Sequence, residues 1–69
     1  MIEVFATNVQ EAAQAKMLVD LLTRRFPGNK INFDLSDCDK ILRVEGKNFT
    51  ADGIMLLLKE TGFACAVLE

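Results

Sequence analysis

The stretch TNVQEAAQAKMLVDLLTRRFP, residues 7–27, predicts an amphipathic helix that decides how the rest of the chain must fold. At about 100° per residue, one face collects its apolar side chains: Ala12, Ala15, Leu18, Val19, Leu22 and Phe26. Two overlapping capping-box spacings mark its start: Thr7 with Gln10 and Asn8 with Glu11. Its end is expected at Phe26, because the proline that follows disfavours helical angles in the residue before it. A second layer must therefore cover this apolar face.

Alternating apolar residues on both sides of this helix predict strands. In residues 2–6, the inward side is expected to hold Ile2, Val4 and Ala6, and the outward side Glu3 and Phe5. A second strand is expected over residues 31–35, with Ile31, Phe33 and Leu35 alternating with polar residues. In residues 40–45, the prediction places Leu42 and Val44 inward and Ile41 and Arg43 outward. The polar turn at residues 36–39 joins these two strands into a hairpin.

The last third of the chain predicts a second helix and a final strand. Thr50 is a favourable N-cap, and Ile54, Leu57 and Leu58 share one face of the helix. Gly62 ends the helix in the position that favours a left-handed residue. The final strand, residues 63–68, is expected to turn Phe63, Cys65 and Val67 inward. The resulting order, β-α-β-β-α-β, predicts a single α+β domain over residues 1–69. It is a ferredoxin-like sandwich with a four-stranded antiparallel sheet and two helices on one face.

Composition excludes several classes of protein. With 51% hydrophobic residues the chain is not disordered, and no run reaches the roughly 18 apolar residues of a membrane span. The first residues carry no signal-peptide pattern, so a cytoplasmic domain with two free thiols is expected. The net charge of −2 argues against nucleic acid as the main partner. Without histidine or a Gly-rich phosphate loop, the sequence predicts no enzyme and no catalytic residues.

Four stretches in order resemble heavy-metal-associated domains, the copper-chaperone and metal-ATPase modules. They are IEVFATN, the helix ending in FPG, INFDL with its hairpin to ILRVEG, and the helix ending in TGFACAVL. The resemblance implies the ferredoxin-like fold over the whole chain. It also implies a metal site with the motif Met-x-Cys-x-x-Cys, and here this chain departs from the family. The methionine position falls on Val9, and the two cysteine positions fall on Glu11 and Gln14.

Loss of both thiolates removes the basis for Cu(I) selectivity, because a carboxylate and an amide offer hard oxygen ligands. We therefore expect no resident cofactor. Glu11, Gln14 and Cys38 remain weak candidates for a non-standard metal site. The favoured interpretation of Glu11 is a capping residue near the positive end of the helix. Phe63, which would flank the family's metal, is expected to serve as core packing.

The two cysteines are predicted to differ in environment. Cys65 lies on the inward side of the last strand, where it should act as a small buried hydrophobe. Cys38 lies in the hairpin turn between Asp37 and Asp39, so we expect it to be exposed. A disulfide between them is not expected. A calcium loop would need a glycine where Asp39 stands, which favours a solvated acidic turn.

The apolar residues that the core leaves over suggest an interaction surface. Phe5 and Ile41 are expected on the open side of the sheet, beside Arg43, and Met17 and Leu21 lie off the main stripe of the first helix. A ferredoxin-like RNA-binding face would need more aromatic residues than Phe5 alone. We therefore predict a non-enzymatic interaction or regulatory module that binds another protein or itself, with no membrane or nucleic-acid partner. The alternative is metal-ion binding or transport through the non-standard site.

Overall fold

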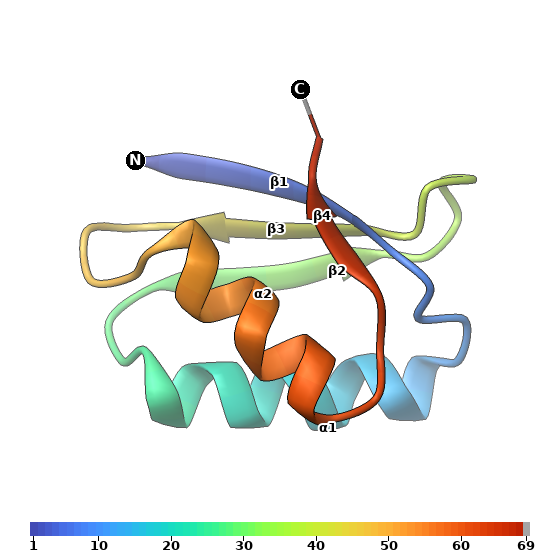
Figure 1. Ribbon diagram of the computed structural model, residues 1–69, viewed down its shortest axis with the longest axis horizontal. Coiled ribbons are helices and arrows are strands. Elements are labelled where there is room, and N and C mark those ends of the chain that lie inside the picture. Colours follow the sequence, from blue (N-terminus) through green and yellow to red (C-terminus); the bar gives the residue numbers. More distant parts are fainter. Residues whose placement is uncertain (69) are drawn as a thin grey trace.

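The chain has a ferredoxin-like fold, seen in a computed structural model that describes residues 1–68 (Figure 1). The elements in order are β1 (Ile2–Thr7), α1 (Ala12–Arg25), β2 (Lys30–Asp34), β3 (Ile41–Glu45), α2 (Ala51–Glu60) and β4 (Cys65–Val67). The strands form one antiparallel sheet in the order β2-β3-β1-β4. The predicted α+β architecture is thus confirmed. Neither helix of the described residues has the length and apolar character needed to cross a membrane.

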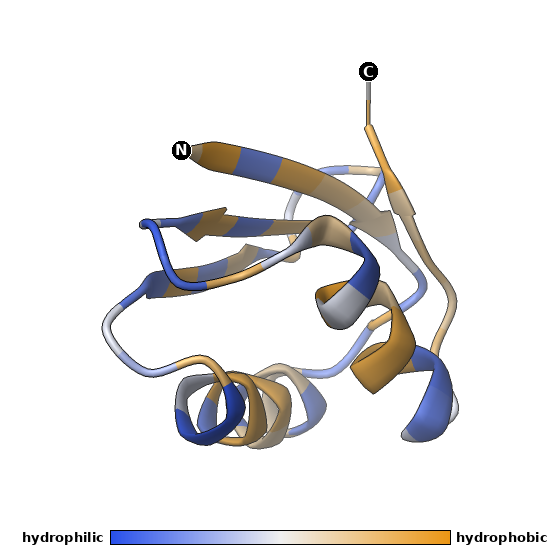
Figure 2. Cartoon of the chain, turned by 60° about the vertical axis from the view of Figure 1, so that its left-hand side comes forward, coloured by the Kyte–Doolittle hydropathy of each residue, from blue (hydrophilic) through white to orange (hydrophobic). Residues whose placement is uncertain are grey.

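Both helices lie on the same side of the sheet, and the core fills the space between the two layers (Figure 2). α1 contacts β2, α2 contacts β4, and the helices contact each other. The fully buried side chains come from both layers and are Phe5, Val9, Leu18, Leu22, Leu42, Val44, Ile54 and Leu58. The predicted inward residues of the hairpin and of α2 are therefore confirmed. Hydrophilic and hydrophobic residues alternate along the strands, as a sheet with one covered face requires.

The predicted orientation of the first strand is wrong. Phe5 is fully buried and pairs with Leu42 on the helix side of the sheet, whereas Val4 pairs with the exposed Arg43 on the other side. Burying the Phe5 ring removes a large aromatic surface from water, and it leaves Ile2 exposed and Val4 and Ala6 partly exposed on the other side. Phe5 is therefore not an interaction residue.

The last strand is shorter than predicted and covers less of the core. Cys65 and Phe63 pack against the core as expected. Val67 pairs with Phe5 on the helix side, the predicted direction, but it remains 38% exposed. β4 is an edge strand, so one flank of Val67 has no neighbouring strand to cover it.

The second helix begins and ends as its sequence predicts. The Thr50 hydroxyl accepts a hydrogen bond from the Gly53 N–H at 3.1 Å. At the other end, the N–H of Gly62 donates to Lys59 O at 3.0 Å and that of Phe63 to Leu58 O at 2.9 Å. With Gly62 at φ 95°, this is a Schellman cap. Local sequence alone determines both ends of α2.

The first helix ends at its C-cap Phe26, as predicted, but neither predicted capping box forms at its start. Helical residues begin at Ala12, which is exposed although the apolar stripe placed it inward. Thr7 belongs to β1, and its hydroxyl donates to the carbonyl of Lys40 and accepts from the Val9 N–H. Asn8 Oδ1 accepts from the Ala64 N–H at 2.8 Å. The side chains that were predicted to cap α1 instead form hydrogen bonds with residues that are distant in the sequence.

At the opposite end of the sheet, Asn29 joins the loop after α1 to the loop after β3. Its Nδ2 donates to Phe26 O at 2.8 Å and to Asn48 O at 3.3 Å, and its Oδ1 accepts from the Asn48 N–H at 3.3 Å. Gly46 lies directly against this side chain with φ 154°. A Cβ on Gly46 would stand 2.0 Å from Asn29 Oδ1, so only glycine fits there.

Candidate functional site

In the loop that would hold metal in heavy-metal-associated domains, one residue packs into the core here, while Asn8, Gln10 and Glu11 are exposed. Val9 is fully buried in the core. Glu11 is exposed at the N-cap position of α1, and its side chain makes no cap hydrogen bond, so its predicted capping role is wrong. The favoured N-cap residues, Ser, Thr, Asp and Asn, have short side chains whose oxygen lies close to the backbone N–H groups. The Glu11 side chain is longer and makes no such bond here. Gln14 lies within α1 and is partly buried.

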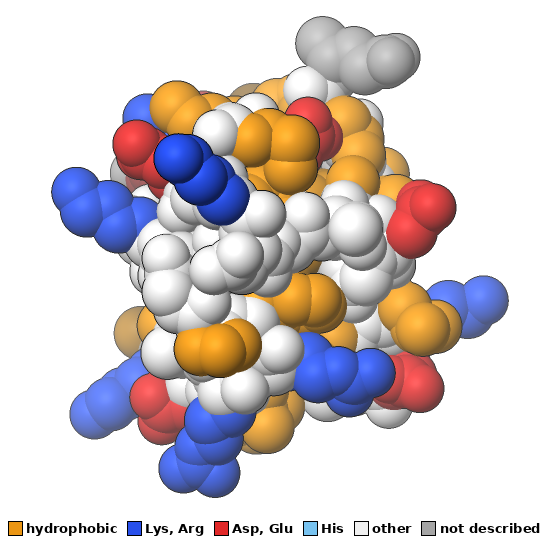
Figure 3. All heavy atoms as spheres, turned by 90° about the vertical axis from the view of Figure 1, so that its left-hand side faces the viewer, with side chains coloured by type: hydrophobic (Ala, Val, Ile, Leu, Met, Phe, Trp, Pro, Cys, Tyr) orange, Lys and Arg blue, Asp and Glu red, His pale blue; other side chains and the backbone are white. Residues whose placement is uncertain are grey.

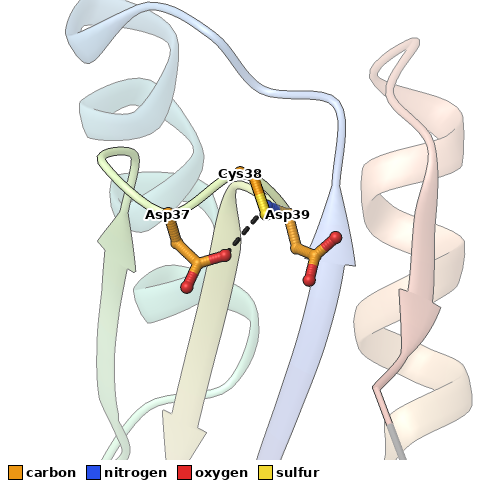
Figure 4. A group of neighbouring side chains, drawn as sticks. All are labelled: Asp37, Cys38 and Asp39. Atoms are coloured by element: carbon orange, nitrogen blue, oxygen red, sulfur yellow. Dashed lines mark hydrogen bonds between the residues drawn. The ribbon is translucent and has the colours of Figure 1, made fainter.

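The hairpin turn brings together the one group of three potential metal-ligating side chains found among residues 1–68: Asp37, Cys38 and Asp39 (Figure 4). Their ligand atoms lie within 4.8 Å of one another, and all three residues are exposed. Glu11 is not part of this group. The turn is adjacent to the end of β1, because the Thr7 N–H donates to Asp39 O at 3.0 Å. Cys38 therefore lies near other potential metal ligands, whereas Glu11 belongs to no such group of three among the described residues.

The acidic side chains of the turn already have structural roles. Asp37 Oδ1 accepts from the Asp39 N–H at 2.9 Å. Asp34 Oδ1 accepts from the Ser36 hydroxyl at 2.6 Å and from the Ser36 N–H at 3.2 Å, and the hydroxyl contact in particular lowers the pKa of Asp34. These are Asx turns, in which a carboxylate fixes the backbone two residues ahead. The acidic residues Asp34 and Asp37 therefore have a structural role in shaping the turn.

The two thiols lie in different environments, as predicted, and neither is in a disulfide. Cys38 is exposed, whereas Cys65 packs against the core. Burial raises the pKa of the Cys65 thiol from 9.0 to about 11. Cys65 also lines a groove of about 470 Å³ between α2 and the segment that leads into β4, with Met55, Leu56 and Phe63. A raised thiol pKa disfavours the reactive thiolate, as expected for a thiol that packs against the core.

The side of the sheet that faces away from the helices carries an apolar strip that differs from the predicted one. We call it the open-face strip, and it consists of Ile2, Val4, Ala6, Ile41 and Leu68. Ile2 is 49% and Leu68 43% exposed, while the other three are partly exposed. Leu68 joins the strip because its N–H donates to Val4 O at 2.8 Å. Ile41 and Arg43 keep their predicted outward positions, and Val4 takes the place expected for Phe5.

A second apolar feature lies on α1. Met17 is 45% exposed, and Leu21 packs partly against the core. They line a shallow hollow of about 420 Å³ together with Ala13, Lys16, Asp20 and Arg24. We call Met17 and Leu21 the α1 flank. Both residues were predicted from the helical pattern, because they lie off the main stripe.

Charged side chains of both signs surround the exposed apolar residues. On the side of the molecule seen in Figure 3, Lys and Arg side chains alternate with Asp and Glu, and hydrophobic groups lie between them. Neither sign covers this side. A protein that binds nucleic acid through its backbone phosphates needs a basic face.

Comparison with known proteins gives no relative for this chain: no family model, curated protein or solved structure matches it.

Proposed function

We propose that this chain is a small non-enzymatic, cytoplasmic domain, similar to heavy-metal-associated domains without their thiolate site, that works by binding a protein through the open-face strip. The observation that supports this proposal is the gathering of Ile2, Val4, Ile41 and Leu68 on the uncovered side of the sheet. Isolated exposed apolar residues need no explanation, but a contiguous group that borders charged residues is typical of a binding surface.

The residues next to the strip support a particular kind of partner. Arg43 is exposed and lies directly opposite Val4 in the β1–β3 pairing. Arginine is enriched at interfaces and binds carboxylates in a fork geometry. The strip therefore suits a protein surface or peptide that presents apolar side chains beside an acidic one. Among residues 1–68 this side of the sheet carries no aromatic side chain, so it lacks the platforms on which RNA bases stack.

Capture experiments with matched variants test this proposal. Immobilised wild type, Ile41→Asp, Arg43→Glu and Leu56→Asp would each be exposed to an extract of the source cells. Leu56 is the control, because it is 52% exposed on α2, away from the strip. We expect wild type and the Leu56 variant to retain the same protein and the two strip variants to lose it. Retention by all four, with folding verified by circular dichroism, would contradict the proposal.

The turn supports a second candidate function, metal-ion binding. Its supporting observation is the closeness of the Asp37, Cys38 and Asp39 ligand atoms. An anaerobic titration of the reduced protein with Cu(I) and Zn(II) against a competing chelator tests it, with Cys38→Ser and Glu11→Ala in parallel. A bound equivalent that Cys38→Ser abolishes and Glu11→Ala preserves would establish the turn as the site. A protein that retains no metal excludes this candidate.

A further inference from the structure

The β2 strand forms an edge of the sheet whose outer side has no strand partner among the described residues. β2 pairs only with β3, and the order β2-β3-β1-β4 places it at one edge. Its five residues, Lys30–Asp34, form an unbroken pairing with β3 and contain no proline. An edge strand presents unpaired N–H and C=O groups, which can pair with a strand of another chain.

The sequence of β2 is complementary to itself when two copies run antiparallel. With a twofold axis through Asn32, Lys30 of each copy lies opposite Asp34 of the other, and Ile31 lies opposite Phe33. Lys30, Asn32 and Asp34 are exposed on the open side of the sheet, while Ile31 and Phe33 are only partly buried on the helix side. One register therefore aligns opposite charges on one side and apolar side chains on the other.

We propose that a second copy of this chain binds at the β2 edge in this register, so that two four-stranded sheets join into one across a twofold axis. The inference rests on the proposed role as an interaction module but uses a different surface from the open-face strip. The hydrogen bonds from Ser36 both reach Oδ1 of Asp34, and Asp34 is exposed. Directly opposed pairs of opposite charge stabilise antiparallel strands.

The position of the α1 flank fits the same assembly. Phe26, near the end of α1, faces α2, because its ring lies 3.0 Å from where a Cβ on Gly53 would stand. At about 100° per residue, Met17 and Leu21 fall on the opposite flank of α1. α1 contacts β2 and α2 contacts β4, which lies at the other edge of the sheet. The α1 flank therefore points toward the β2 edge, where a second copy would bring its own α1 flank.

Sedimentation equilibrium from about 1 μM to about 1 mM tests the dimer, since small interfaces of this kind are weak. We expect wild type to dimerise within this range. Lys30→Asp and Asp34→Lys should each weaken self-association about tenfold, because each replaces two attractive pairs by two repulsive ones. An equimolar mixture of the two variants should restore the dimer, since every pair in the mixed dimer is again of opposite charge.

Lys59→Asp is the matched control, because it makes the same charge change on exposed α2 and should leave the dimer intact. A wild type that stays monomeric, charge variants that dimerise like wild type, or a mixture without restored dimer would each overturn the inference. Failure of the proposed function looks different. If the protein dimerises but captures no partner through Ile41 or Arg43, the inference about the β2 edge stands and the proposed function fails. If it captures a partner but stays monomeric, the proposed function stands and the inference fails.

Discussion

The two helices of this domain begin in opposite ways. α2 takes its first cap from Thr50, three residues before the Gly53 N–H that it binds. α1 begins at Glu11 without a side-chain cap, and the segment before it is held by Thr7 and Asn8, whose partners lie 33 and 56 residues away. One start depends on local sequence, and the other depends on the completed fold. The segment between β1 and α1 is therefore tied to the residues that precede β3 and β4.

The largest effects should come from the apolar residue that each start buries. Phe49 precedes the α2 cap and is 7% exposed, and Val9 lies before α1 and is fully buried. We expect Phe49→Ala to lower the free energy of unfolding by about 3–5 kcal/mol and Val9→Ala by about 2 kcal/mol. Urea denaturation followed by circular dichroism measures both. Leu56→Ala is the control, expected within about 0.5 kcal/mol of wild type because Leu56 is exposed. A Val9→Ala variant as stable as this control would show that the first loop is not anchored by the core.

Removing the polar side chains of Thr50 and Asn8 should have a local effect on the structure in the first case and a distant effect in the second. Thr50→Ala should cost about 1 kcal/mol and speed exchange of the Gly53 amide. Asn8→Ala should cost about 0.5–1 kcal/mol and speed exchange of the Ala64 amide, far away in sequence. Hydrogen–deuterium exchange by NMR reads both sites at once. If both variants accelerated exchange of the same amides to the same degree, the two helix starts would not differ in their dependence on local and distant contacts.

The thiol of Cys65, next to Ala64, reports on the same contact between Asn8 and Ala64. Burial raises the Cys65 pKa to about 11 from 9.0, which lowers its thiolate fraction near pH 8 about a hundredfold. We expect slow alkylation of Cys65 in a Cys38→Ser background and up to about fivefold faster alkylation once Asn8→Ala is added, since about 1 kcal/mol opens the segment by that factor. Thr50→Ala in that background should leave the rate unchanged. Mass spectrometry of the alkylated protein measures the rate.

The pH dependence of stability follows from the same pKa. The folded pKa of Cys65 is raised, so its burial stabilises the fold fully below pH 9.0, and this contribution is lost as the pH rises toward about 11. Cys65→Ala should therefore flatten the alkaline part of the stability curve relative to wild type. Urea midpoints across this range measure the difference. Identical slopes in the two proteins would mean that Cys65 ionises equally well in the folded state.

The smallest effect should come from giving α1 the local cap that it lacks. Glu11 has the extended angles of an N-cap, φ −111° and ψ 140°, similar to −123° and 149° at Thr50. Glu11→Ser should add about 0.5 kcal/mol by supplying a short acceptor, whereas Glu11→Ala should leave stability nearly unchanged. Thermal melts of the three proteins check this. A large loss in Glu11→Ala would mean that the carboxylate contributes through the helix dipole after all.

Periodicity predicted the elements of this fold because their signals are local. The apolar stripe of α1, the hairpin alternation at Leu42 and Val44, and the caps of α2 at Thr50 and Gly62 all act over a few residues. Alternation indicated the wrong side of β1, because Ile2, Val4 and Ala6 share one side whereas Phe5 shares the other with the charged Glu3. The aromatic ring of Phe5 was the one local feature that favoured the observed orientation.

The candidate sites depended more on tertiary structure. Leu68 joins the open-face strip only through its pairing with Val4, which is remote in sequence. The closeness of Asp37, Cys38 and Asp39 was implied by their adjacency, but the roles of the two aspartates required coordinates. Glu11 and Gln14 were identified only by alignment to a motif that this chain lacks.

The contact between Gly46 and Asn29 constrains the order in which this sequence can change. A side chain at Gly46 would overlap Asn29 Oδ1, so a mutation at Gly46 costs less once Asn29 has been replaced by a smaller residue. Replacing Asn29 first removes its bonds to Phe26 and Asn48, and the backbone strain of φ 154° remains for any L residue at position 46. The two positions are therefore epistatic: the cost of a mutation at Gly46 depends on which residue stands at position 29, while Asn29 can change with Gly46 in place.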